Sequence, residues 1–332
     1  MGAQERDNHD KGCVVKGLFI ITRTNEMHKH FESFKCLGNQ VRTYTYDHRL
    51  DTKWAKGETL EAEIYADAKE YQPDIIVYVG ACRSSTPSAK SFAKLRKEVA
   101  PTVHFCSDAA DEPWWDELKT YDREGSFTVQ VAIDGNKNWP LADTQITALT
   151  PIDPAHYPDP PKPHAERSIV FGFAGNPGGV GAVKDGKVTG RRPLVSQMIQ
   201  FGLQHRPRDR TTGNMDDAIS SYKQAAAYMA DCRITPNFAQ TGSFNRMHVK
   251  GRVVETGLAG AMLLEPVGSP TPDWFEPGVD YMPYQSMDDA RTIVERFKDR
   301  PDETQAFGAR LRARVLAEHS PAQFWARILD RI

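Results

Sequence analysis

Short apolar runs and amphipathic stretches alternate along the first half of the chain. The apolar runs predict strands over residues 14–21, 41–46, 74–80, 102–106 and 127–133. The stretches between them predict helices over residues 26–36, 60–71 and 88–99. Strands that are apolar throughout and alternate with helices are typical of a parallel sheet covered on both faces.

The second half repeats this pattern. It predicts strands over residues 168–174, 232–236 and 261–265, and helices over 191–205, 216–229, 250–258, 287–298, 302–319 and 321–332. The last helix has a strong start, because Ser320, Pro321 and Gln323 occupy the N-cap, N1 and N3 positions.

A proline-rich segment separates the two halves. Six prolines fall within residues 151–163, and proline removes a backbone donor, so this segment cannot be the interior of a sheet or helix. We therefore expect a polar tail (1–12), an N-terminal Rossmann-like domain (13–150), a linker (151–167), a C-terminal Rossmann-like domain (168–319) and a final helix (320–332). Two such domains predict a ligand site between the carboxyl ends of their sheets.

Composition narrows the class of protein. The chain has 42 basic and 44 acidic residues, a formal charge of −2, which does not favour binding nucleic acid by bulk electrostatics. Five scattered cysteines predict neither a disulfide framework nor a zinc site, and they indicate a reducing, cytoplasmic location. No apolar run approaches the roughly 20 residues of a membrane span, and no signal peptide is expected.

The most informative block is residues 250–265, KGRVVETGLAGAMLLE. It resembles the donor-site signature of GT-B glycosyltransferases, in particular the CgeB-like group related to spore-maturation proteins. The pattern is an arginine, two apolar residues, a glutamate, a turn of small residues and an apolar strand. The resemblance continues at 170–175, 232–237, 275–280 and 284–289, and spans about 168–330. Over the first half it is one of architecture only.

The resemblance implies that the C-terminal domain binds a nucleotide diphosphate-sugar. Lys250 and Arg252 would bind the diphosphate at a helix start, where backbone amides also favour an anion. Glu255 would accept hydrogen bonds from the ribose hydroxyls. The alternative is that Arg252 and Glu255 form a solvated i, i+3 ion pair.

A glycine-rich loop at residues 175–181 follows the first strand of the second domain. Gly175, Asn176 and Gly178 could bring backbone amides close to a phosphate, and Arg191 at the next helix start could reach the diphosphate. The loop lacks GxGxxG spacing, so it is not a dinucleotide fingerprint. The alternative is an ordinary surface loop.

One position departs from the resembled family. Many retaining GT-B enzymes have a second glutamate eight positions before the ribose-binding one, and this chain has Met247 there. Arg246 and His248 flank that position and could supply polar contacts instead, and Asn237 ends a strand near the expected sugar. The alternative is that Arg246 and His248 are ordinary surface residues.

In the first domain, the strand at 102–106 leads to Asp108. Asp108 could act as general base on the acceptor hydroxyl or orient His104. The alternative is an aspartate that caps the next helix. Residues 22–25 are candidate acceptor contacts, and Trp114 and Trp115 are a candidate sugar platform.

We therefore expect a glycosyltransferase, a hexosyl- or pentosyltransferase, that needs no metal or other cofactor beyond the donor. Its acceptor is unidentified: a glycan, a small molecule, a protein or a modified nucleic-acid base. Two alternatives remain open, a nucleotide-sugar epimerase on the same fold and a nucleotide-sugar-binding protein that has lost catalysis.

Overall fold

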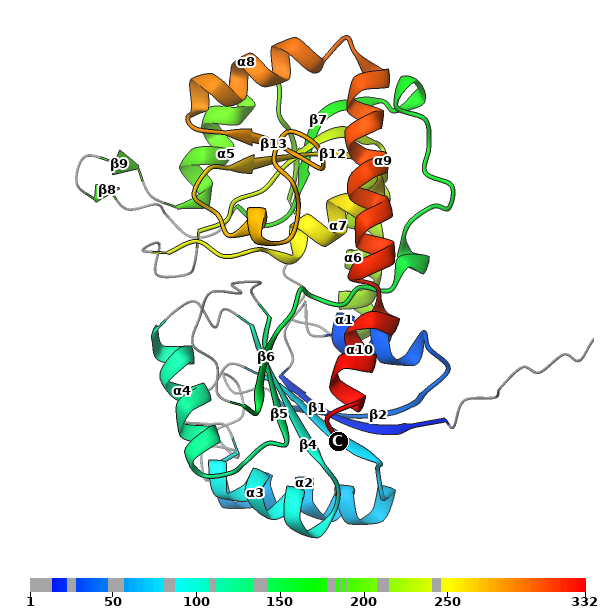
Figure 1. Cartoon of the computed structure of the whole chain (residues 1–332), viewed down its shortest axis with the longest axis vertical. Helices are drawn as coiled ribbons and strands as arrows, with labels where there is room; N and C mark the ends of the chain where they lie inside the picture. The colour runs from blue at the N-terminus through cyan, green and yellow to red at the C-terminus, as the bar shows by residue number, and fades with distance from the viewer. Residues whose placement is uncertain are drawn as a thin grey trace, which may run out of the picture.

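The chain forms two parallel α/β units, one from each half of the sequence (Figure 1). This computed structural model describes residues 14–22, 28–46, 57–80, 87–107, 112–133, 143–177, 183–184, 187–188, 190–207, 215–240 and 246–332. The predicted class, two domains built on parallel sheets with alternating helices, is confirmed.

The first sheet has six parallel strands in the order β2-β1-β3-β4-β5-β6. They are β1 (Lys16–Thr22), β2 (Gln40–Tyr46), β3 (Ile75–Val79), β4 (Thr102–Ser107), β5 (Val129–Ile133) and β6 (Gln145–Thr147). The helices are α1 (His28–Lys35), α2 (Gly57–Tyr71), α3 (Ala89–Glu98) and α4 (Glu112–Arg123). Strand order reverses between β1 and β3, so the helix that follows β1 starts near a point where open parallel sheets bind ligands.

The second sheet has five parallel strands in the order β10-β7-β11-β12-β13. They are β7 (Ile169–Ala174), β10 (Gln204–Arg206), β11 (Cys232–Pro236), β12 (Met262–Pro266) and β13 (Met282–Tyr284), and two short strands, β8 (Val183–Lys184) and β9 (Lys187–Val188), pair separately. The helices are α5 (Arg191–Ile199), α6 (Met215–Ala230), α7 (Gly251–Ala259), α8 (Met287–Phe297), α9 (Pro301–Glu318) and α10 (Pro321–Leu329).

The last helix crosses back to the first unit. In Figure 1, α10 (red) lies beside α1 and the first sheet. Its Trp325 is fully buried in the same apolar cluster as Phe19 of β1 and Phe34 of α1. The indole nitrogen of Trp325 donates to the Ser33 hydroxyl at 3.0 Å. The two ends of the chain therefore share one core, and α10 ties the second unit to the first.

The proline-rich linker packs along the second unit. Ile152 and Tyr157 are buried in the cluster that contains α7, and the Arg167 guanidinium donates to the carbonyls of Cys232 and Ala259. The linker contains two short 3-10 turns, η2 (Pro154–His156) and η3 (His164–Glu166). These contacts hold the connection in a defined position.

One predicted element is wrong. The pattern predicts a helix over 191–205, but α5 ends at Ile199 and residues 204–206 form β10 beside β7. Gly202 adopts φ 102°, a left-handed conformation that ends the helix and allows the chain to turn into the sheet. The edge strands β6 and β13, three residues each, were not predicted because they are too short for a periodic pattern.

Candidate functional site

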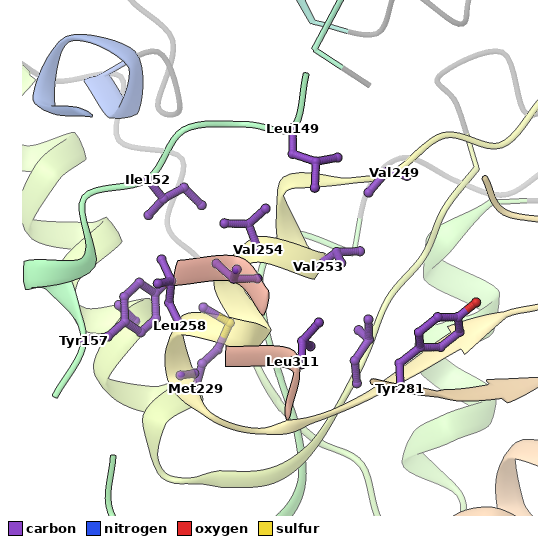
Figure 2. Close-up of a cluster of buried hydrophobic side chains, with 14 of the residues drawn as sticks. Leu149, Ile152, Tyr157, Met229, Val249, Val253, Val254, Leu258, Tyr281 and Leu311 are labelled. Atoms are coloured by element: carbon purple, nitrogen blue, oxygen red, sulfur yellow. The ribbon is translucent and has the colours of Figure 1, made fainter. Parts of the chain in front are cut away.

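The helix that carries the predicted donor residues begins where the two units meet. Its apolar face, Val253 and Val254 among others, shares a cluster with Leu149 and Ile152 from the segment that follows β6 (Figure 2). A Cβ atom added at Gly251 would lie 3.3 Å from the Thr150 hydroxyl, which shows how closely the two segments approach. Helix α7 ends at Ala259, and the next residue, Gly260, forms a left-handed C-cap with φ 64°.

Glu255 lies on α7 and is 5% exposed. Its Oε2 is 3.3 Å from Nη1 of Arg252, so the predicted i, i+3 pair exists; the Glu255 side chain is 6% exposed and that of Arg252 15%, so the pair is largely shielded from solvent. Its Oε1 is 2.6 Å from Nζ of Lys29, which belongs to α1 of the first unit. The carboxylate expected to bind ribose thus contacts two cations, one from each unit.

Arg252 connects α7 to the carboxyl end of β7. Its Nη2 donates to the carbonyl of Ala174, and its guanidinium lies over the Phe173 ring, 5.1 Å from the centroid. A Cβ atom at Gly175 would lie 2.9 Å from the Phe173 ring and 3.3 Å from Nη2 of Arg252. A residue larger than glycine would therefore disturb the arginine.

Two further basic side chains hold the start of the glycine-rich loop. The ring Nε2 of His205 is 2.9 Å from the Gly175 carbonyl, and Nη1 of Arg191 donates to the Asn176 carbonyl at 3.1 Å. The His205 ring also stacks on Phe173, with centroids 5.6 Å apart. Together with Arg252, these residues contact three successive carbonyl groups, and they bring Arg191 and Arg252 to the same strand end.

The sequence did not identify His205 as a site residue, because the helix predicted over 191–205 included it. His205 lies in β10, and its register partner is Phe173 of β7. This pairing places His205 beside the loop. Lys29 was also missed, although it lies in a predicted helix, because its partner is 226 positions away along the chain.

The remaining predicted residues of the second domain lie on the segments that lead into α7. Asn237 and His248 are both 2% exposed, while Arg246 is exposed. Lys250 occupies the N-cap position of α7. Met247 forms an isolated bridge with Gln240. Arg246 therefore has a surface position, and Lys250 stands directly before the helix that carries Arg252.

A second buried acid in this domain was also missed. Glu265 is the penultimate residue of β12, is 1% exposed and accepts a hydrogen bond from the Thr271 hydroxyl at 2.8 Å. Among the described residues its Oε2 has no hydrogen-bond partner, and the same holds for Nδ2 of Asn237. Burial raises the pKa of Glu265 to about 7. An acid at the end of an otherwise apolar strand was the available signal.

His104 is not in a position to act as a catalytic group. It is fully buried in β4, where its ring stacks against Tyr78 and Phe127 at 5.3 and 5.0 Å between centroids. Burial lowers the pKa of His104 to about 4. This position does not favour the expectation that His104 is a catalytic group oriented by Asp108, because the alternation of residues along β4 points its ring into the apolar core beneath α3 and α4.

Several predicted positions lie outside what the structure describes. Asp108 and Gly178 are among them, as are residues 23–25. Trp114 and Trp115 belong to α4, but their side chains are likewise outside the described set. Their roles stay predictions.

In the described ranges, no group of three or more His, Cys, Asp or Glu side chains is arranged to hold a metal ion. Within the same ranges, no helix combines the length and apolar character needed to cross a bilayer. Metal independence stays a prediction.

The chain resembles known proteins in its second half and in its fold. A family model for glycosyl transferase-like proteins matches residues 196–330, which include Asn237, Arg252 and Glu255. Among curated proteins, none matches the sequence significantly.

Solved structures of similar shape cover nearly the whole chain. Sucrose-phosphate synthase of Thermosynechococcus elongatus aligns with a TM-score of 0.62 at 10% identity, over 95% of this chain and 98% of that one. HepE of Anabaena, in complex with UDP and glucose, aligns at 0.58 and 12% identity, over 96% and 100%. A glycosyltransferase of Rickettsia africae aligns at 0.58 and 10% identity, over 96% and 97%. At identities this low, the structural similarity establishes a common fold and nothing more. That fold is the predicted GT-B arrangement.

Proposed function

We propose that this protein transfers a glycosyl group from a nucleotide diphosphate-sugar to a hydroxyl acceptor. The observation that carries the proposal is the largely buried Arg252–Glu255 pair, which lies where the two units meet and within the matched range 196–330. Arg252 also reaches the strand end that leads into the glycine-rich loop. A carboxylate, cations and a close backbone turn are the groups that a ribose diphosphate requires.

In this proposal Glu255 accepts hydrogen bonds from the ribose hydroxyls. Arg252, Arg191 and Lys250 neutralise the diphosphate, with backbone amides of the loop after Gly175. A guanidinium has five N–H donors, so an arginine can hold a carbonyl oxygen and still reach a phosphate. Charge builds up on the diphosphate as the glycosyl bond breaks, and fixed cations stabilise it without a metal ion.

The acceptor side rests on fewer residues. Asp108 follows β4 and is our candidate general base, while His104 is withdrawn from that role. The CgeB-like relationship, the hexosyl or pentosyl identity of the sugar, the acceptor class and the cytoplasmic location remain predictions. The Anabaena protein was solved with UDP and with UDP-glucose, so uridine nucleotides are the first donors to test.

The experiment is a thermal-shift panel of UDP, ADP, GDP, CDP and dTDP with their sugar conjugates. A ligand that binds only the folded state raises the melting temperature by mass action. We expect at least one diphosphate to do so, and Glu255→Ala to abolish most of the shift. Glu295→Ala is the matched control, because it removes an acid from an exposed i, i+3 pair with Lys298 in the same domain and should leave the shift intact.

The conjugate that binds most tightly is then incubated alone and with a set of acceptors. Release of the diphosphate with transfer, or slow hydrolysis, supports a transferase. Conversion of the sugar without release would identify an epimerase, and binding with neither reaction would identify a protein that has lost catalysis. If no nucleotide moves the wild-type melt, the donor site itself is refuted.

A further inference from the structure

The first turn of α1 carries three consecutive basic residues, His28, Lys29 and His30, and all three are buried. Lys29 is 6% exposed. Its Nζ lies 2.6 Å from Oε1 of Glu255 and 4.7 Å from the ring centroid of Tyr222 on α6. A lysine of the first unit thus reaches the carboxylate that we assign to the donor ribose.

This position is costly for a cation. The first turn of a helix has a partial positive charge, which disfavours a lysine, and taking an ammonium group out of water costs further free energy. Glu255 offsets this cost, but it also contacts Arg252 at 3.3 Å. Two cations thus contact one carboxylate, a distribution of charge that is suited to an additional anion.

The side chain can also change partners without moving the helix. Lysine has a flexible four-carbon stem and a compact ammonium group, so its charge can move while its Cα stays in place. Arg252 is more restricted, because it also holds the Ala174 carbonyl and covers the Phe173 ring. Lys29 is therefore the cation of this pair that is able to exchange its partner.

We propose that Lys29 is a donor-binding residue supplied by the first domain. While the donor site is empty, it neutralises Glu255. When ribose hydroxyls take that carboxylate, the Lys29 ammonium moves to the diphosphate. The inference rests on the proposed function, because it assumes that Glu255 binds the ribose.

The exchange has a measurable consequence. A nucleoside diphosphate provides both the ribose that displaces Lys29 and the anion that receives it. A nucleoside without phosphates has to break the Lys29–Glu255 pair, and it has no anionic group that could bind the displaced ammonium. Lys29 should therefore favour diphosphates over nucleosides, and its removal should reduce that preference.

The test compares the binding of UDP and uridine by calorimetry, or of the corresponding pair if the panel selects another base. We expect Lys29→Met to weaken UDP binding by about 10- to 100-fold while uridine binding stays the same or improves. Lys29→Arg, which keeps the charge, should retain most of the UDP affinity. Lys35→Met is the matched control, because Lys35 is exposed on the same helix.

The ratio of the two affinities separates this role from a structural one. A lysine that only holds the domains together would lower both affinities by the same factor, and that result, or an unchanged UDP affinity, overturns the proposal. If Lys29→Met does not fold, Lys29→Gln, which keeps a donor for Glu255, undergoes the same ratio test. Wild-type protein that binds no nucleotide would instead refute the proposed function.

Discussion

Glu255 and Glu265 are two buried carboxyl groups ten positions apart, and their surroundings are opposite. Glu255 lies on α7 at the junction of the two units and contacts the cations of Lys29 and Arg252. Glu265 lies at the end of β12 and accepts a hydrogen bond from a neutral hydroxyl, that of Thr271. Equal burial therefore does not give two carboxyl groups the same electrostatic environment, because the charge of their neighbours differs.

The comparison has an energetic side. A buried carboxylate that neutralises two cations stabilises the fold through its charge, so its loss leaves those cations uncompensated. At Glu265 burial disfavours the charged form more than hydrogen bonds from neutral donors favour it, so ionisation of this group lowers the stability of the fold. The two acids should consequently respond in opposite directions to the same substitution.

The largest expected effect is that of Glu255→Gln. This change removes the negative charge and leaves the buried Lys29 and the partly buried Arg252 without it, which should lower the free energy of unfolding by ~3–5 kcal/mol. Urea denaturation at pH 7.5 measures the change. Adding Lys29→Met should restore part of the loss, because it removes one of the two cations. A double variant no more stable than the single one would show that the pair is not electrostatically coupled.

Glu265→Gln should act in the opposite direction and depend on pH. Because burial raises the pKa of Glu265 from 4.5 to about 7, its stabilising contribution is complete below pH 4.5 and is lost as the pH rises through 7. Glutamine stays neutral, so the variant should match the wild type near pH 4 and exceed it at pH 8, by up to roughly 3 kcal/mol. Melting curves across this range measure the difference. An offset that does not vary with pH would mean that Glu265 is ionised in the folded protein throughout.

The smallest effect concerns His104, a buried base with no charged partner in the described core. Because burial lowers the pKa of His104 from 6.5 to about 4, its stabilising contribution is present above pH 6.5 and is lost as the pH falls toward 4. His104→Phe keeps a ring between Tyr78 and Phe127. It should therefore reduce the loss of stability between pH 7.5 and 5.5 by roughly 1–2 kcal/mol. Nucleotide binding and turnover should stay within about twofold of wild type, and a large loss of turnover would restore His104 as a catalytic candidate.

Local patterns were sufficient for much of the architecture. Apolar runs located most strands of both sheets, because a parallel strand covered on both faces must be apolar along its length. They failed at Gly202, where a left-handed backbone turns a predicted helix into a strand, and at the three-residue edge strands, which are too short to show a repeating pattern. The order of Arg252, Glu255 and the following glycines also located the candidate donor helix, since those residues are close in the chain.

Contacts between distant residues decided the rest. Lys29 and Glu255 are 226 positions apart, and Trp325 and Ser33 are 292 apart, so no local pattern connects them. The position of His104 was also decided by packing. The sequence placed it in a strand that leads to the expected cleft, and in the folded chain its ring lies in the core. Residue order is enough to specify where strands and helices form, because that depends on near neighbours. Which charges meet in the interior depends on how the two sheets and the last helix pack, and only the folded chain determines that.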